Sequence, residues 1–107
     1  MRPEVLNIFN YANKARQEGN FALAVQLYNE ITQKLDPAYG PAHLNLSDLC
    51  RQQNNLIGER QEILAFLECP LTGRTIDFLQ TAKVRLQELE NILNPKPAII
   101  TPPPVVK

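Results

Sequence analysis

Gly19-Asn20-Phe21-Ala22-Leu23-Ala24-Val25-Gln26-Leu27-Tyr28, followed by Leu35-Asp36-Pro37, is the stretch that decides the expected fold. Gly19 suits the residue after a helix, because glycine adopts positive φ without a steric penalty. Asn20 is a favoured N-cap for the next helix, and Pro37 cannot continue that helix. Residues on one face of this helix recur at steps of three and four: Phe21, Ala24, Tyr28, Ile31 and Leu35. The stretch therefore predicts a helix end, a turn and a second helix over residues 21–35.

The residues before this stretch predict a first helix over residues 4–18. Pro3 suits the first turn of a helix, and Glu4 complements its positive end. An apolar stripe follows at helical spacing, widened by Leu6 and Phe9: Val5, Ile8, Ala12 and Ala15. The two predicted helices are joined by a turn of about two residues, so we expect them to pair as an antiparallel hairpin.

The residues after Pro37 predict a second hairpin, with helices over residues 41–53 and 56–68. Pro41 opens its first helix as Pro3 opens the first, and Asn54-Asn55 replaces Gly19-Asn20 as the turn, since asparagine also tolerates left-handed geometry. Pro70 ends the hairpin 33 residues after Pro37, which indicates an internal repeat.

These features resemble a tetratricopeptide repeat, a helix-turn-helix unit of about 34 residues. The matching residues are Ala12, Gly19, Phe21, Ala24, Tyr28 and Pro37. The resemblance implies an all-α, right-handed solenoid of hairpins, with repeats over about 4–37 and 38–70. Ala12 and Ala24 would lie where the two helices cross, since larger side chains would force the axes apart. In the second repeat Ser47 falls where Ala12 fell.

The chain departs from the family pattern at two places. The spacing from Tyr28 to Pro37 is one residue longer than usual. Glu59 stands where Ala24 should recur, so we expect the fourth helix either to pack with a shifted register or to belong to a hairpin that has drifted from the family.

Residues 74–93 predict a fifth helix with a narrow apolar seam, which Ile76 and Phe78 would thicken near its start. The seam repeats at steps of three and four: Leu79, Ala82, Leu86, Leu89 and Leu93. Charged and polar residues are expected outside it: Lys83, Arg85, Gln87, Glu88 and Glu90. One interpretation is a capping helix that covers the open end of the repeats. The other is a coiled-coil seam for a partner or a second copy.

The chain divides into a helical domain over residues 1–93 and a Pro-rich tail over residues 94–107. Asn94-Pro95-Lys96-Pro97 ends the fifth helix, and Pro102 to Pro104 favour polyproline II. The tail is either a linker or, because it carries Ile99, Ile100, Val105 and Val106, a segment that docks on a partner.

Composition argues against several classes of function. Eleven basic and eleven acidic residues give a formal net charge of zero, whereas nucleic-acid binders carry a basic stripe. The sequence has no run of 18 apolar residues and no apparent secretory signal, so we expect a cytoplasmic protein without a membrane span. Cys50 and Cys69 make neither a disulfide framework nor a zinc site. We expect no cofactor or metal and no catalysis, and His43 is expected to pack rather than react.

The expected function is protein interaction without catalysis, as an adaptor, an assembly factor or a subunit of a larger complex. In the family the first helices of successive repeats line a groove that binds a peptide or a partner helix. The groove-facing positions implied here are Leu6, Phe9, Asn13, Arg16 and Gln17, followed by Leu44, Asn45, Asp48, Arg51 and Gln52. Phe9 and Leu44 could instead complete the core.

Two alternatives to this function remain open. The chain could be a structural or oligomerising subunit that uses the fifth helix and the tail, or an auxiliary domain of a longer enzyme. One subfamily of these repeats grips C-terminal carboxylates with lysine, arginine and asparagine. Asn13 and Asn45 match its asparagines, but Phe9 and Phe78 replace basic residues, so we expect no such clamp.

Overall fold

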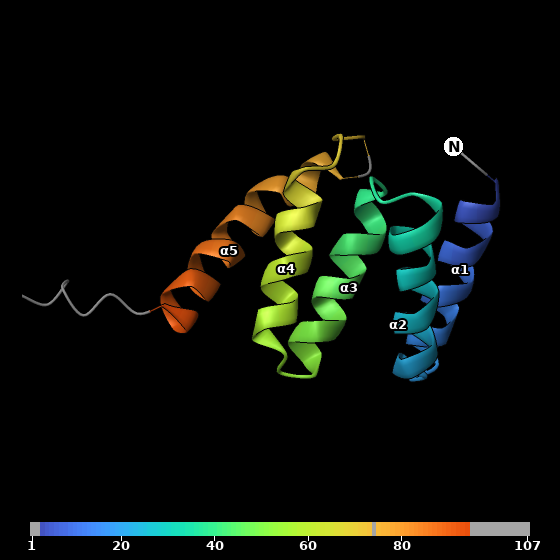
Figure 1. The fold of residues 1–107 in the computed structure, drawn as a ribbon, viewed down its shortest axis with the longest axis horizontal. Helices are drawn as coiled ribbons and strands as arrows, with labels where there is room; N and C mark the ends of the chain where they lie inside the picture. The colour runs from blue at the N-terminus through green and yellow to red at the C-terminus, as the bar shows by residue number, and fades with distance from the viewer. Residues whose placement is uncertain (1–2, 74, 95–107) are drawn as a thin grey trace, which may run out of the picture.

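The computed structural model describes residues 3–73 and 75–94, and over this part of the chain the regular structure is entirely helical (Figure 1). The prediction of an all-α fold with about five helices is confirmed. The α-helices are α1 (Pro3–Gln17), α2 (Phe21–Glu30), α3 (Gly40–Gln52), α4 (Leu56–Leu67) and α5 (Leu79–Leu93). Two short helices of other types extend this set: the π-helix η1 (Ile31–Leu35) and the 3-10 helix η2 (Ile76–Phe78).

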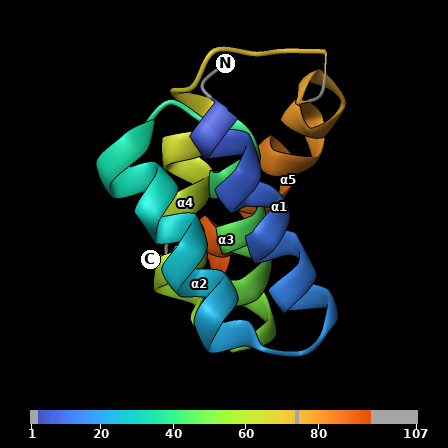
Figure 2. The same cartoon turned by 90° about the vertical axis from the view of Figure 1, so that its right-hand side faces the viewer.

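Successive helices run in opposite directions and form two layers. Helices α1 and α2 make one hairpin and α3 and α4 the next (Figure 1). Seen from the end, α1, α3 and the start of α5 lie toward one side of the molecule and α2 and α4 toward the other, while α5 crosses toward the α2 side along its length (Figure 2). The row of α1, α3 and α5 is the face on which the candidate site is found.

Both hairpin turns use the same local chemistry. Gly19 and Asn54 adopt left-handed φ angles of 82° and 59°, and the N–H of the following residue bonds to the carbonyl five residues earlier at 2.8 Å. Asn20 and Asn55 then cap the next helix, because their side-chain oxygens accept the N–H three residues on, at 3.3 and 3.0 Å. The prediction that Asn54-Asn55 replaces Gly19-Asn20 is confirmed.

The core of the first hairpin is built around the two predicted alanines. Ala12 and Ala24 are fully buried, and Ser47, at the position equivalent to Ala12, is 6% exposed. Small side chains at these points let the helix axes approach closely. Tyr28 and Ile31, also fully buried, complete this core beside them.

The segment between Tyr28 and Pro37, expected to be one residue longer than in the family that the chain resembles, contains a π turn. The predicted helix over residues 21–35 reaches Leu35, but its last five residues form η1, and Asp36 donates its N–H to the carbonyl of Ile31 at 2.7 Å. A π turn closes over five residues rather than four, so it holds one more residue than an α turn. The helix can therefore keep Tyr28 in the core and still end before Pro37.

Glu59, which stands where Ala24 was expected to recur, is buried and its carboxylate is paired with α5. Its side chain is 2% exposed, and Arg85 donates to both carboxylate oxygens, from Nε at 2.7 Å and from Nη2 at 3.0 Å. A second bidentate pair, Arg60 with Glu90 at 3.1 Å, lies one residue along α4 and is about one third exposed. The expectation that Arg85 and Glu90 lie outside the packed side of the fifth helix is thus wrong.

The fifth helix begins later than predicted. Residues 76–78 form the short η2 and α5 starts at Leu79, because Thr75 is buried and its hydroxyl accepts the N–H of Thr72 at 3.0 Å in a local turn. Ile76 and Phe78 do not thicken the seam, since they are 53% and 51% exposed.

The seam of α5 packs against α4 of the same chain. Ala82 and Leu89 are buried with Ile63 and Phe66 in a second core, and Leu86 is partly buried against it. This contact agrees with the capping interpretation of the helix. The seam is therefore covered from within the chain. No described helix has the length and apolar character needed to cross a membrane. The expectations for the Pro-rich tail concern residues 95–107, which lie outside the described part.

Candidate functional site

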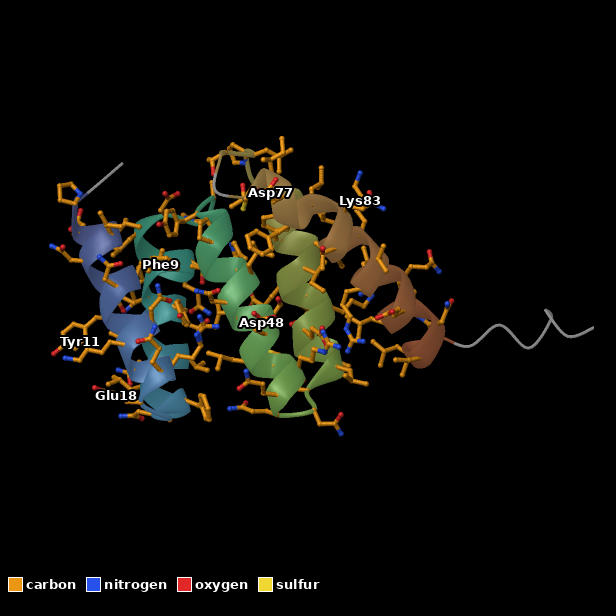
Figure 3. The ribbon with its side chains drawn as sticks, turned by 180° about the vertical axis from the view of Figure 1, so that it is seen from behind. Phe9, Tyr11, Glu18, Asp48, Asp77 and Lys83 are labelled. Carbon is orange, nitrogen blue, oxygen red and sulfur yellow. The ribbon has the colours of Figure 1, made fainter. Side chains whose placement is uncertain are left out.

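A groove of about 370 Å³ lies between α3 and the start of α5, with α4 beneath it, and a more open hollow of about 470 Å³ lies along α2 and η1. Figure 3 looks onto the side of the molecule that holds the groove, with Asp48 on α3 and Lys83 on the outer edge of α5. Helices α3 and α5 belong to the same row but are separated, and the side chains of α4 reach the space between them. The groove therefore exists because α5 packs on α4 rather than on α3.

The end of the groove near the start of α3 is apolar. Leu44, Ile63 and Ala82 line it, and Phe78 stands at its edge with half of its surface exposed. Threonine hydroxyls of Thr75 and Thr81 are the polar groups at this end. An exposed aromatic ring beside a buried apolar floor is a common feature of binding sites, because the ring can lose further contact with water when a partner docks.

The other end of the groove, near the end of α3, carries charge. Asp48 and Arg51 are exposed there, and Arg16 of α1 approaches Asp48 at 4.0 Å. Although the Asp48 side chain is 60% exposed, partial desolvation of its carboxyl raises the pKa of Asp48, while Arg16 and Arg51 oppose that shift. Glu59 and Arg85 also line this end, and their mutual hydrogen bonds raise the pKa of the guanidinium above its usual value although burial opposes it. This pair holds the groove wall in place.

Five of the ten predicted site residues line this groove: Phe9, Leu44, Asn45, Asp48 and Arg51. The other five do not line it: Leu6, Asn13, Arg16, Gln17 and Gln52. The groove extends from Phe9 of α1 across α3 to α5, so it includes α5, which the prediction left out.

Asn13 and Asn45 are brought together, but they bond to each other. The side-chain amide of Asn45 donates to Oδ1 of Asn13 at 3.0 Å and to the hydroxyl of Tyr28 at 3.2 Å. The Tyr28 hydroxyl in turn donates to Oδ1 of Asn13. These three residues, the amide–tyrosine network, join α1, α2 and α3. Asn13 is thus a structural residue at the junction of the two hairpins.

Phe9 completes the core instead of standing free in the groove. It is 7% exposed and its ring contacts Tyr39 edge to face, with centroids 5.2 Å apart, and Tyr28 at 5.9 Å. One edge of the ring reaches the groove. Leu44 is half-buried and packs against the second core, so both residues serve packing as well as the groove wall.

Nine groove residues were not among the predicted site residues: Pro41 and Ser47 of α3, Glu59 and Ile63 of α4, and, in and before α5, Thr75, Phe78, Thr81, Ala82 and Arg85. Two features of the sequence could have indicated them. Glu59 stands where alanine was expected, and a charged residue at a core position needs a buried partner from elsewhere in the chain. Phe78 lies one position before Leu79, the first residue of the apolar seam, and is therefore not part of the seam.

His43 lies outside the groove and is bonded through both ring nitrogens. Nε2 donates to the carbonyl of Pro37 at 2.8 Å, and Nδ1 lies 2.8 Å from the carboxylate of Glu62. Burial lowers the pKa of His43, but the hydrogen bonds to Glu62 and Pro37 outweigh it, so that the pKa is raised above its usual value. His43 links α3 to α4 and to the loop before α3.

Comparison of the chain with protein-family models, with curated proteins and with solved structures gives no match. Among the described residues no group of three or more His, Cys, Asp or Glu side chains could hold a metal ion. Cys50 and Cys69 are free thiols, and burial raises the pKa of each. Function must therefore be inferred from the shape and chemistry of the groove.

Proposed function

We propose that this chain is a non-catalytic protein-interaction module, built from one well-matched and one degenerate tetratricopeptide repeat, that binds a peptide or partner helix in the groove between α3 and α5. The single observation that carries the proposal is the half-exposed ring of Phe78 beside the apolar floor formed by Leu44 and Ile63. Apolar contact at one end and charged groups at the other suit a partner with both kinds of side chain.

The size of the groove limits what can enter it. About 370 Å³ falls in the range of roughly 300–1,000 Å³ that ligand sites occupy. A helix with its side chains is about 10 Å or more across, so a partner helix would insert the side chains of one face. An extended peptide would insert a few consecutive residues. In either case Phe78 and Leu44 are the expected anchor contacts.

The composition of the chain supports a proposal for its cellular compartment and for the class of its partner. Zero net charge favours a protein partner over nucleic acid. Free thiols at Cys50 and Cys69 suit a reducing compartment, and we therefore place the module in the cytoplasm. The small residues at the helix crossings, Ala12, Ala24 and Ser47, support the kinship with tetratricopeptide repeats.

Selection of peptides from a random display library on the full chain tests this function. We expect binders of about micromolar affinity that lose at least tenfold, or about 1.4 kcal/mol, on Phe78→Ala. Val84→Ala is the matched control, because Val84 is 50% exposed on α5, the helix that follows Phe78, and does not line the groove. Failure to select any binder, or equal loss with both variants, would reject the groove as the binding site.

One observation favours a second candidate function, a contact with another subunit through α5. Val84 and Ile92 are 50% and 53% exposed on this helix. Such a contact would use the outer surface of α5, since its seam already packs on α4. Sedimentation of Val84→Asp beside the unchanged chain separates the two: loss of an oligomer supports the subunit role, and a monomer in both cases supports the groove.

A further inference from the structure

We propose that the partner in the groove between α3 and α5 is an amphipathic helix with an acidic residue two turns from its apolar anchor, so that its carboxylate bonds to Arg51 while the anchor packs against Leu44 and Phe78. This rests on the proposed function and names the chemistry of the partner at that same site. The grounds are the hydrogen-bond donors that are free at the charged end of the groove and their distance from the apolar end.

Arg51 supplies the free donors at the charged end of the groove. It is exposed near the end of α3, and within residues 3–73 and 75–94 it makes no hydrogen bond or ion pair. A guanidinium carries five N–H donors in a planar fork, which fits a carboxylate through two parallel hydrogen bonds. A carboxylate of a partner can therefore bond to Arg51 without breaking any bond of the described fold.

Arg16 adds a second positive charge beside Arg51. Its Nη1 lies 4.0 Å from Oδ2 of Asp48, too far for a hydrogen bond, and Arg51 attracts the same carboxylate. These three residues, the Asp48 cluster, carry two positive charges and one negative charge, and Asp48 marks their place on this face (Figure 3). An approaching carboxylate is attracted by the Asp48 cluster, whereas a lysine of a partner would meet two guanidinium groups.

The guanidinium of Arg85, at the same end of the groove, is already occupied. Its Nε and Nη2 donate to Glu59, and its Nη1 donates to Glu88 at 3.1 Å. Glu59 is 2% exposed and Glu88 does not line the groove, so neither carboxylate is presented to a partner there. The charge that a partner meets is therefore that of the Asp48 cluster.

The spacing along α3 sets the distance between the apolar and the charged contact. Leu44 and Arg51 are seven residues apart, so they lie about 10.5 Å apart along the axis and on nearly the same face of α3. A partner helix that runs beside α3 has the same rise per residue. An acidic residue seven positions from the anchor therefore reaches Arg51 when the anchor packs against Leu44 and Phe78.

Selection from a display library of helical peptides on the full chain tests this inference. Each peptide has about 18 residues in an alanine-based frame, which is long enough to form a helix, with one face randomised and the C-terminus blocked. We expect the binders to carry glutamate or aspartate seven positions from a large apolar residue. Enrichment of lysine or arginine at that position, or no preference for charge there, overturns the inference.

A double-mutant cycle then assigns the acidic residue to its partner in the groove. Replacing that glutamate of a selected peptide by glutamine should weaken binding to the unchanged chain by about fivefold or more, and binding to Arg51→Gln by less than about twofold. Lys83→Gln is the matched control, because it removes the same charge from the exposed outer edge of α5, away from the groove (Figure 3). Equal losses on the unchanged chain and on Arg51→Gln overturn the inference.

The same peptides separate this inference from the proposed function. Binders that weaken on Phe78→Ala but do not depend on the acidic position overturn the inference and leave the groove as a binding site. A library that yields no binder overturns the proposed function as well.

Discussion

Glu59 is a buried charged residue that supports the fold through a partner distant in the sequence. Its carboxylate is buried and both oxygens accept from Arg85. Arg85→Ala leaves this buried charge without its partner, for which we expect a loss of about 3–5 kcal/mol in the free energy of unfolding. Urea unfolding followed by circular dichroism measures the loss.

Two variants provide the controls: one removes the other partner of the buried pair, and one breaks a more exposed ion pair. Glu59→Ala should cost less than Arg85→Ala, because Arg85 keeps its contact with Glu88 at 3.1 Å and is itself 18% exposed. Arg60→Ala breaks the pair with Glu90, which is about one third exposed, and should cost about 1 kcal/mol or less. Equal losses for all three variants would contradict the buried character of the Glu59–Arg85 pair.

His43 makes the stability of the second hairpin depend on pH. Its pKa in the folded chain is raised above the reference value of 6.5, so the folded state binds the proton more tightly than the unfolded state does. The resulting stabilisation is fully present below about pH 6.5 and is lost as pH rises through the folded pKa. We expect the stability difference between the unchanged chain and His43→Gln to shrink over that interval.

The single histidine of the sequence makes this measurement direct, because one imidazole resonance reports its titration. Glu62→Gln removes the carboxylate that accepts from Nδ1, and should lower the pKa of His43 relative to the unchanged chain. An imidazole that titrates below 6.5 in the unchanged chain would contradict the arrangement described here.

The π turn at the end of α2 defines where the chain tolerates a change of length. Deleting Gln33, which is exposed within Ile31–Leu35, converts the π turn to an α turn and should cost about 1 kcal/mol or less. Deleting Gln26, exposed within α2, rotates the residues after it by about 100° and turns Tyr28 and Ile31 out of the core. Thermal unfolding should stay cooperative for the first deletion and be lost for the second.

The role of α5 as a cover for α4 leads to a separate expectation. Leu89 is fully buried in the second core, so Leu89→Ala should cost about 2–5 kcal/mol, whereas Ile92→Ala, at an exposed position, should cost about 0.5 kcal/mol or less. Sedimentation should show the same association state for both. If Leu89→Ala changed the association state and left the stability unaltered, the seam would belong to a partner.

Across the whole molecule, features that depend on neighbouring residues could be predicted from the sequence, whereas features that depend on contacts distant in the sequence could not. The hairpin turns followed from Gly19, Asn20 and Asn54-Asn55, because capping and positive φ are decided within a few residues. The crossing alanines followed from the repeat pattern. These local signals fix both hairpins but say little about the position of α5.

The groove could not be predicted in the same way, because it depends on contacts distant in sequence. Glu59 and Arg85 are 26 residues apart, and Arg60 and Glu90 are 30 apart. Together with the second core they hold α5 against α4, and so open the space beside α3. Helical spacing alone predicted that Arg85 faces solvent. A charged residue is rarely buried unless it is paired, and the sequence does not reveal which residue is its partner.

The amide–tyrosine network of Asn13, Tyr28 and Asn45 has a consequence for how the molecule responds to its surroundings. Amides do not titrate, and burial raises the pKa of Tyr28 above its usual value near 10. The bonds of this network therefore carry no charge across the physiological range, unlike the neighbouring contact of Arg16 with Asp48. His43 instead bonds within the second hairpin and to Pro37 in the loop before it. Titration of His43 should thus be felt at the second hairpin and that loop, while the amide–tyrosine network stays formed.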